Sequence, residues 1–305
     1  MKYTVVLTAA YPPIARQILA GEFDIIEHPT EPERTEDDVI TILSEADAAI
    51  TLLSDPLTRR VLASNPNLRM IANYAVGYNN VDIAAARELG ITITNTPGVL
   101  TEATADLTMA LILAVTRRLM EGHDDVRRTG RSEWEPLKWL GTSLQKKRLG
   151  IIGIGRIGTA VAARARAFGM EVVGVRRGDV LDSLLASSDI VSVHAPLNRE
   201  THHLIDASAI AKMKRGSFII NTARGPIVDE DALCNALQSG HLAGAGLDVY
   251  EFEPTVNPRL QAMPNVVLAP HIGSATFEAR SEMARIAATD VFRFLKGQPP
   301  IHPVI

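Results

Sequence analysis

The chain has 305 residues, of which 46% are hydrophobic and 22% are charged, and its formal net charge at pH 7 is −4. This length fits two domains with ordinary cores, and the weakly acidic balance offers no basic surface to a nucleic acid. No stretch approaches the roughly 20 apolar residues of a membrane span, and the N-terminus resembles an opening strand more than a signal peptide. The single cysteine, Cys234, fits a reducing compartment. We therefore expect a cytoplasmic protein that binds neither nucleic acid nor membrane.

The first 97 residues alternate between short strand-like and helix-like segments. In order, strand and helix by turns, these segments are 4–9, 12–20, 24–28, 36–46, 48–53, 56–63, 68–75, 82–90 and 91–96. Strands separated by helices in this way are typical of a parallel, doubly wound sheet. This part of the chain therefore predicts a complete small α/β domain.

A long helix is expected next, from residue 101 to residue 119. Thr101 is a suitable N-cap, and Glu102 places a negative charge in the first turn. A polar connector that contains two tryptophans, Trp134 and Trp139, then occupies residues 121–145. The long helix therefore marks the boundary between two α/β units.

The stretch 147–177 predicts a nucleotide site. A short apolar strand leads into Gly153, Gly155 and Gly158, which open an alanine-rich helix, and a second strand follows. In a dinucleotide-binding βαβ unit the first glycine makes a tight turn, the second lets the backbone approach a pyrophosphate and the third lets the helix pack on the strand. We therefore assign cofactor binding to these glycines and to the residues between them, Arg156 and Ile157.

The alternation resumes after this unit and continues to the end of the chain. The expected segments are 181–188, 189–195, 208–214, 217–223, 230–240, 243–249, 265–270 and a final helix at about 275–296. They predict a second doubly wound parallel sheet. We expect one domain at 1–97, completed by 283–305, and a second at 98–282.

Polar side chains follow four successive strands of the second domain. They are His194, then Asn221, Thr222 and Arg224, then Asp248, Glu251 and Glu253, and finally His271. Ligands of doubly wound sheets bind at the carboxyl ends of the strands. These side chains are therefore expected at one edge of the sheet, where the chemistry takes place.

Several long motifs, in the order of the chain, carry a resemblance to a known family. They are YAVGYNNVD at 74–82, TNTPGVLTEATADL at 94–107, GIIGIGRIG at 150–158, INTARGPIVDEDAL at 220–233, AGAGLDVYEFEP at 243–254 and PHIGSAT at 270–276. Together they resemble the D-isomer specific 2-hydroxyacid dehydrogenase family, and most of all its glyoxylate and hydroxypyruvate reductases. The resemblance implies a flavodoxin-like substrate domain followed by a Rossmann cofactor domain.

The resemblance also implies a catalytic set of Arg224, Glu253 and His271. The guanidinium of Arg224 suits a 2-keto acid because it can hold the carboxylate and polarise the keto group. His271 suits the proton donor, and a neighbouring carboxylate would orient its ring and stabilise the imidazolium. The spacing leaves Glu251 and Glu253 as alternatives for that carboxylate, and the family pattern favours Glu253.

The remaining site residues also follow from the resemblance. Leu52, Val76 and Gly77 would contact the substrate, the last two through backbone N–H groups, together with Arg224 and His271. No His or Cys spacing suggests a metal site. The further cofactor contacts would be His194, Ala195, Pro196, Thr201, Thr222, Ala223, Asp248 and Gly273.

The end of the strand at 171–175 bears on the choice between NADP and NAD. An NAD enzyme usually has an acidic residue there for the ribose 2′-hydroxyl, whereas this chain has Arg176 and Arg177. Two guanidinium groups would attract a 2′-phosphate, so we expect NADP(H) to be preferred, with Asp179 keeping NAD(H) possible. Only residues 178–180 separate the arginines from the next helix, where relatives have about a dozen more residues with an edge strand.

The expected substrates are small 2-keto acids, glyoxylate and hydroxypyruvate first, with glycolate and D-glycerate as products. The connector 134–144 resembles that of such reductases, in some of which a tryptophan from the partner subunit reaches the active site. We therefore expect a homodimer, with Trp139 or Trp134 either at that site or buried in the interdomain hinge or the dimer arm. The alternatives are an NAD-linked D-lactate, phenylpyruvate or D-3-phosphoglycerate dehydrogenase, and a cofactor-sensing corepressor.

Overall fold

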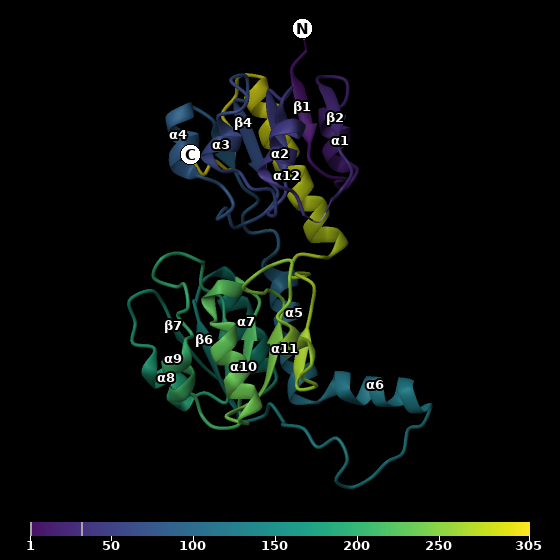
Figure 1. Cartoon of the computed structure of the whole chain (residues 1–305), viewed down its shortest axis with the longest axis vertical. Coiled ribbons are helices and arrows are strands. Elements are labelled where there is room, and N and C mark those ends of the chain that lie inside the picture. The colour runs from purple at the N-terminus through teal and green to yellow at the C-terminus, as the bar shows by residue number, and fades with distance from the viewer. Residues whose placement is uncertain (1, 32) are drawn as a thin grey trace. The chain divides into compact units, whose positions relative to one another are not determined.

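The computed structural model describes residues 2–31 and 33–305. The chain divides into two compact units, Met1–Leu100 with Ala275–Ile305, and Thr101–Ser274 (Figure 1). The second division lies before the last helix, α12 (Phe277–Leu295), whereas the sequence placed it inside that helix, at 282–283. The whole of α12 belongs to the first unit because its buried face, including Met283, Ala287 and Val291, packs into that core.

The first unit is a parallel five-stranded sheet with strand order β2-β1-β3-β4-β5. This is the flavodoxin-like order, as expected. The strands are β1 (Thr4–Leu7), β2 (Asp24–Glu27), β3 (Ala48–Thr51), β4 (Met70–Asn73) and β5 (Thr92–Thr94). The helices are α1 (Ile14–Leu19), α2 (Glu36–Leu43), α3 (Arg59–Leu62), α4 (Ile83–Leu89) and α12.

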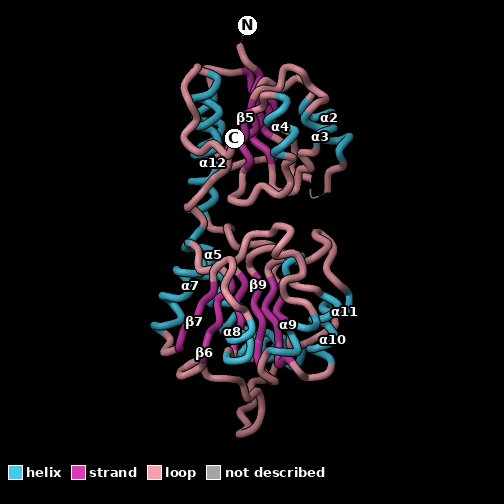
Figure 2. The backbone as a smooth tube through the Cα atoms, turned by 90° about the vertical axis from the view of Figure 1, so that its left-hand side faces the viewer, coloured by secondary structure: helices cyan, strands magenta, loops and turns pink. Residues whose placement is uncertain are grey.

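Alternate strand residues of the first sheet enter two different cores. Val5 and Leu7 pack with α1 and α12 on one face, while Val6 packs with α2, α3 and α4 on the other. This follows from the two-residue period of a strand, whose successive side chains point to opposite faces. Both faces of the sheet are therefore covered, as Figure 2 shows, and ligands can reach it only at its edges.

The second unit is a parallel six-stranded sheet with strand order β11-β10-β9-β8-β6-β7. Its strands are β6 (Arg148–Ile152), β7 (Glu171–Val175), β8 (Ile190–Val193), β9 (Ser217–Asn221), β10 (Leu242–Leu247) and β11 (Val266–Leu268). Its helices are α5 (Thr101–Thr116), α6 (Leu119–Thr129), α7 (Arg156–Ala167), α8 (Asp182–Ser187), α9 (Ala207–Lys212), α10 (Glu230–Gln238) and α11 (Pro258–Gln261), with a 3₁₀ turn at Gly225–Ile227.

The strand β7 lies at the edge of this sheet. In the dinucleotide-binding order 3-2-1-4-5-6, a third strand flanks the second. Within the described unit 101–274 no strand flanks β7, because α8 begins at Asp182, a few residues after the strand ends. The short segment after Arg177 thus leaves the edge of β7 uncovered, as its length suggested.

The expectation of a polar connector from 121 to 145 was partly wrong. The helix α5 ends at Thr116, Arg118 adopts a left-handed φ of 53°, and a second helix, α6, follows at once. The helix α6 could not be predicted from the sequence, because α6 buries no residue and has no apolar face that packs against a core. With the loop after it, α6 projects from the rest of the second unit (Figure 1).

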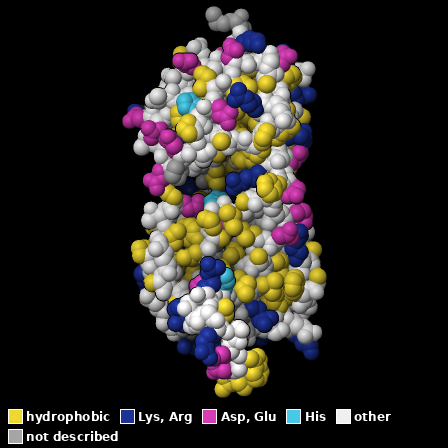
Figure 3. Space-filling view, turned by 90° about the vertical axis from the view of Figure 1, so that its right-hand side faces the viewer, with side chains coloured by type: hydrophobic (Ala, Val, Ile, Leu, Met, Phe, Trp, Pro, Cys, Tyr) yellow, Lys and Arg dark blue, Asp and Glu magenta, His cyan; other side chains and the backbone are white. Residues whose placement is uncertain are grey.

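The arm made of α6 and residues 130–143 exposes several large apolar side chains. Trp134 is 85% exposed and Leu137 81% exposed, and Leu119, Val126 and Leu140 are also exposed. Figure 3, which looks from the side toward which α6 points, shows hydrophobic side chains on that face of the second unit. Contiguous exposed apolar surface commonly marks a protein interface.

Residues 2–31 and 33–305 contain neither a membrane-spanning helix nor a cluster of metal-ligating side chains. No helix in these ranges combines the length and the apolar character needed to cross a lipid bilayer. Within the same ranges, no three His, Cys, Asp or Glu residues are grouped in a way that would hold a metal ion.

Candidate active site

The imidazole of His271 lies beside the carboxylate of Glu253. His271 follows β11 in a left-handed conformation with φ of 53°, and its Nδ1 is 2.9 Å from Glu253 Oε2. Both side chains are about one-third exposed, so the free ring nitrogen of the histidine remains available to a ligand. The geometry is that of a carboxylate that orients a histidine.

The loop that carries His271 is anchored by Asp248 at the end of β10. The buried carboxylate of Asp248 accepts hydrogen bonds from the backbone N–H groups of Ile272 at 2.7 Å and Gly273 at 2.8 Å. Thr104 of α5 donates its hydroxyl to the Gly273 carbonyl oxygen at 3.0 Å. These bonds fix the backbone on the C-terminal side of His271, so Asp248 positions the histidine whatever else it contacts.

The Glu253 carboxyl group has a pKa below its usual value. Burial alone would raise this pKa, but the hydrogen bond and charge of His271, the backbone N–H of Tyr250 and the charge of Arg224 outweigh burial. The Tyr250 N–H donates to Glu253 Oε1 at 3.0 Å. Glu253 is therefore an anion at neutral pH and can accept a hydrogen bond from the neighbouring ring.

The guanidinium of Arg224 is placed by the turn that follows β9. Asn221, the last residue of β9, donates its side-chain amide to the Arg224 carbonyl oxygen at 3.0 Å and accepts the Ala223 N–H at 3.0 Å. Arg224 also donates from Nη1 to the Ala223 carbonyl oxygen. Burial lowers the pKa of Arg224 and the charge of Glu253 opposes this change. Because an arginine pKa starts so high, the group stays a cation.

The two glutamates have different partners. Glu253 contacts His271, whereas Glu251 lies 2.6 Å from His203 Nε2 and accepts the backbone N–H of Glu230. His203 is half-buried in this contact. This pair links the loop after β10 to the segment before α9, and the sequence did not indicate it.

The glycine turn after β6 has the shape that a dinucleotide site requires. A Cβ atom at Gly153, where φ is 97°, would lie 2.7 Å from the His194 carbonyl carbon, and one at Gly158 would lie 2.3 Å from the Gly153 carbonyl oxygen. A Cβ at Gly155 would meet nothing within 4 Å, and α7 begins there without a side-chain cap. The first N–H groups of α7, from Arg156, Ile157 and Gly158, therefore face open space, where a phosphate fits.

His194 is a neutral residue behind this turn. Its Nε2 is 2.8 Å from the Ser192 hydroxyl, and its buried Nδ1 has no hydrogen-bond partner among the described residues. Burial lowers its pKa from 6.5 to about 4. An unpaired buried nitrogen next to the glycine turn is a feature that a bound ligand would satisfy.

The other predicted cofactor residues form the surrounding backbone and loops. The Thr201 hydroxyl donates to the Pro196 carbonyl oxygen at 2.7 Å and holds the loop after Ala195 closed. The Thr222 hydroxyl is 3.0 Å from the Thr108 hydroxyl of α5, and Ala223 is half-buried beside it. Their hydroxyl groups therefore have partners within the unit, and direct cofactor contacts from these residues remain predictions.

The two arginines after β7 are exposed and differ in their partners. The Arg177 guanidinium pairs with Glu200 at 2.5 Å, with side chains 80% and 58% exposed. The Arg176 backbone N–H is bound by the Asp179 carboxylate at 2.7 Å, and the Asp179 N–H returns to the Arg176 carbonyl oxygen at 3.1 Å. Asp179 therefore closes a tight turn rather than reaching outward.

The predicted substrate residues Leu52, Val76 and Gly77 belong to the first unit. They follow β3 and β4, at the carboxyl edge of the first sheet. The sequence did not single out two asparagines at that edge, Asn73 and Asn95, whose side chains bind the loop around Val76. Their position directly at strand ends was the same signal that identified the polar residues of the second unit.

The chain is similar to known proteins along most of its length. Residues 109–273 match the family described as D-isomer specific 2-hydroxyacid dehydrogenase, NAD binding domain. The chain is 45% identical over 296 residues to a glyoxylate reductase of Thermococcus litoralis, and the match covers 92% of this chain and 89% of that protein.

Solved structures share the fold over the full length. The crystal structure of the TT0316 protein from Thermus thermophilus matches with a TM-score of 0.94 and 42% identity, covering 99% of this chain and 100% of that one. An NADPH-dependent glyoxylate/hydroxypyruvate reductase from Sinorhizobium meliloti, solved with NADP and malonate, matches with a TM-score of 0.86 and 30% identity, covering 100% and 97%.

Proposed function

Because the chain belongs to the D-isomer specific 2-hydroxyacid dehydrogenase family, we propose that it is an NADP(H)-preferring reductase of small 2-keto acids. It is an NAD(P)-dependent enzyme of that family, and the finer assignment concerns its substrates and its cofactor. Glyoxylate and hydroxypyruvate are the proposed substrates, with glycolate and D-glycerate as products. The observation that carries the proposal is the 2.9 Å contact between His271 and Glu253 on the unit that also holds Arg224 and the glycine turn.

Each member of this set has one task in the proposed reaction. Arg224 binds the substrate carboxylate and polarises the keto oxygen, because a half-buried guanidinium offers charge and several donors together. His271 gives its proton to that oxygen as the oxygen becomes an alkoxide. Glu253 holds the ring through Nδ1 and stabilises the imidazolium before the transfer. The reduced nicotinamide, when bound, supplies the hydride that the keto carbon accepts.

The residues present fit a dinucleotide. Gly155 leaves space at an uncapped helix start, and the unpaired Nδ1 of His194 lies behind the same turn. Backbone N–H groups of Arg156, Ile157 and Gly158 would hold the phosphates. Residues 194–196, Thr201, Thr222, Ala223, Asp248 and Gly273 are proposed to line the remainder of the site.

The preference for NADP(H) rests on the end of β7. Arg176 and Arg177 stand where an NAD enzyme usually has a carboxylate, and both are exposed. The candidate for that carboxylate in the same turn, Asp179, already binds the Arg176 N–H. A 2′-phosphate would therefore meet two cations, whereas a 2′-hydroxyl would lack its usual acceptor.

The proposed substrate site includes Leu52, Val76 and Gly77 of the first unit, with the last two offering backbone N–H groups to the carboxylate. We also propose a homodimer formed through the arm of α6 and residues 130–143, because its exposed tryptophan and leucines resemble an interface more than a free surface.

The test is a steady-state assay of the purified protein with glyoxylate, hydroxypyruvate, pyruvate and phenylpyruvate, each with NADPH and with NADH. We expect the highest kcat/KM for glyoxylate or hydroxypyruvate with NADPH. A higher kcat/KM for pyruvate or phenylpyruvate with NADH would favour an NAD-linked dehydrogenase. Absence of turnover with every pair, combined with tight binding of either cofactor, would instead indicate a cofactor sensor.

A further inference from the structure

The loop after β4 contains two N–H groups that no described residue uses. The Ala75 N–H donates to the Asn73 carbonyl oxygen at 2.8 Å. Over residues 2–31 and 33–305, the next two N–H groups, of Val76 and Gly77, have no acceptor. Both residues are partly exposed. Adjacent N–H groups without acceptors at the carboxyl edge of a sheet are suited to an anion.

The direction of each N–H is set by the carbonyl group in the same peptide plane. A trans peptide is planar, so fixing the carbonyl oxygen of one residue fixes the N–H of the next. The Ala75 oxygen accepts the backbone N–H of Thr96 at 2.9 Å, which fixes the Val76 N–H. The Val76 oxygen accepts the side-chain amide of Asn95 at 2.8 Å, which fixes the Gly77 N–H. One donor is thus held by main chain and the other by a side chain.

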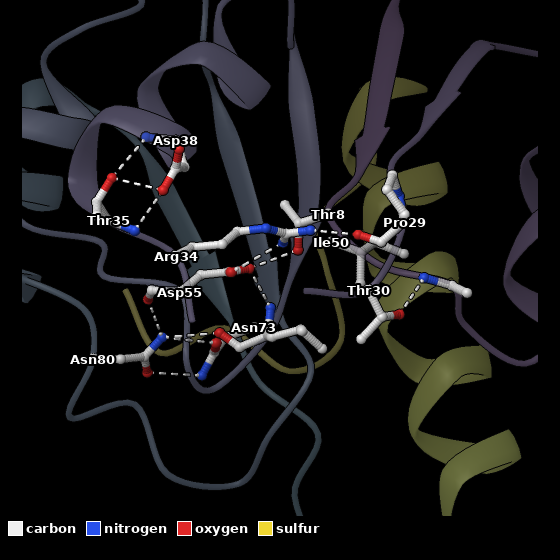
Figure 4. Close-up of polar contacts among 12 residues, drawn as sticks. Thr8, Pro29, Thr30, Arg34, Thr35, Asp38, Ile50, Asp55, Asn73 and Asn80 are labelled. Atoms are coloured by element: carbon white, nitrogen blue, oxygen red, sulfur yellow. Dashed lines mark hydrogen bonds and ion pairs between the residues drawn. The ribbon is translucent and has the colours of Figure 1, made fainter. Parts of the chain in front are cut away.

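The far side of Gly77 is held as well. The amide of Asn73, a fully buried residue, donates to the Gly77 carbonyl oxygen at 2.9 Å and lies 3.4 Å from Asn80 Oδ1. Asn80 in turn donates to the carbonyl oxygens of Leu52 and Asp55 at 3.2 and 3.0 Å. Figure 4 shows Asn73 and Asn80 side by side beneath Asp55. The loops after β3 and β4 therefore share one support.

That support ends in a buried ion pair. Asp55 accepts hydrogen bonds from the Leu52 N–H at 2.8 Å and the Thr8 hydroxyl at 2.6 Å, and it lies 3.3 Å from Arg34 Nη1. The Arg34 and Asp55 side chains are 2% and 1% exposed. Removing either partner would leave a buried charge unpaired and destabilise the unit. A substitution of Arg34 or Asp55 would therefore not separate function from folding.

We propose that Asn95 is a positioning residue that aims the Gly77 N–H at the carboxylate of the 2-keto acid. The inference rests on the proposed function, which supplies the carboxylate. An amide suits this task because it donates to a carbonyl oxygen and remains uncharged at every pH. Without the Asn95 donor, the peptide between Val76 and Gly77 could rotate. The Gly77 N–H would then no longer attract the anion, and the Val76 carbonyl oxygen could turn toward the anion and repel it.

Two substitutions of Asn95 test the proposal. Asn95→Ala removes the donor without adding charge, and Asn95→Asp keeps the shape but sets an oxygen against the Val76 oxygen. In both we expect KM for the 2-keto acid to rise by about tenfold or more, with a smaller change in kcat and an unchanged dissociation constant for NADPH. An increase in KM for Asn95→Asp alone would indicate direct repulsion of the substrate and would overturn the positioning role.

Asn65 provides the matched control. Its buried side-chain amide donates to the carbonyl oxygens of Leu43 and Ala46 at 2.7 and 2.8 Å, away from the carboxyl edge. Asn65→Asp should lower thermal stability and leave KM unchanged. If Asn65→Asp raised KM as much as Asn95→Asp, the effect would be a general loss of structure, and the proposal would be wrong.

A binding measurement separates this inference from the proposed reaction. Oxamate carries the carboxylate of a 2-keto acid but accepts no hydride, so its affinity for the NADPH-loaded full chain is measurable without turnover. We expect wild type to bind oxamate and Asn95→Ala to bind it about tenfold more weakly. Equal affinities, or no oxamate binding by wild type, would overturn the inference. A wild type that binds oxamate but reduces no 2-keto acid would contradict only the proposed function.

Discussion

The carboxyl edges of the two sheets differ in their chemistry. At the edge of the first sheet the proposed ligand groups are backbone N–H groups, and the side chains around them are neutral amides such as Asn73 and Asn95. At the edge of the second sheet the proposed functional groups are the ionisable side chains of Arg224, Glu253 and His271. Two charged side chains of the first unit, Arg34 and Asp55, are buried beneath the loops and compensate each other.

This difference corresponds to two tasks. Fixed dipoles can hold an anion without changing protonation, so an edge built from amides works at any pH. An edge that moves a proton needs groups that titrate, and other residues must hold these groups in place. Asp248 and Asn221 do this in the second unit, whereas asparagines hold the backbone loop of the first. The comparison predicts that loss of His271 or Glu253 at the second edge lowers kcat, whereas loss of the amide support at the first edge raises KM.

The largest expected effect comes from His271→Ala. Removing the proton donor should lower kcat by about 10³-fold, and NADPH binding should change little because the ring contacts Glu253 and not the glycine turn. Steady-state kinetics and a titration of cofactor binding measure the two quantities. The control is His203→Ala, which removes the other histidine paired with a glutamate. A comparable loss of kcat in the control would show that the substitutions disturb the fold, and would not support His271 as the proton donor.

His194 lies at the same edge as His271 but differs from it, because burial keeps His194 neutral. Its pKa is lowered to about 4 in the fold, so between pH 6.5 and 4 the unfolded chain binds a proton that the folded chain excludes. The free energy of unfolding should therefore decrease as the pH is lowered through this range, by up to about 3 kcal/mol from this residue alone. Denaturant unfolding at pH 7, 5.5 and 4 should show a steeper decline for wild type than for His194→Asn. Parallel declines would contradict the buried neutral state.

A smaller effect is expected from neutralising each glutamate. Glu253→Gln keeps the shape but removes the carboxylate charge beside His271 Nδ1, so kcat for reduction should fall by roughly 10- to 100-fold and the alkaline limb of its pH profile should move to lower pH. Glu251→Gln disturbs the pair with His203 and should lower thermal stability with a smaller change in kcat. The pH profile of kcat is the deciding measurement. If Glu251→Gln shifted the profile and Glu253→Gln did not, the two carboxylates would exchange roles.

Much of this organisation could be predicted from local pattern. The alternation of strands and helices indicated both doubly wound sheets, and the glycine spacing indicated the turn between β6 and α7, because both depend on short-range periodicity and on backbone sterics. The polar residues at strand ends were assigned correctly to one unit, since parallel strands bring their carboxyl ends to a common edge.

What could not be predicted depends on contacts between distant residues. The pairing of Glu251 with His203 spans 48 residues, and nothing in either segment signals it. The helix α6 was missed because its apolar residues face outward and no core gives them a period. Asn95 was missed because its side chain acts on the carbonyl oxygen of Val76, which lies 19 residues earlier in the chain. Nor does any local pattern indicate that Glu200 pairs with Arg177.

That pair leads to the smallest expected effect, at the exposed end of β7. Replacing Arg176 and Arg177 by alanine should weaken NADPH about tenfold, because exposed cations contribute modestly, while NADH should change little. Glu200→Gln frees the Arg177 guanidinium and removes a carboxylate near the proposed 2′-phosphate, so NADPH should bind a few-fold more tightly. Both changes should be largest at low salt. Titrations with NADPH and NADH at two ionic strengths measure them. Equal weakening of both cofactors in the double variant would place the arginines elsewhere on the dinucleotide, and the selectivity of this open edge would then depend on other residues.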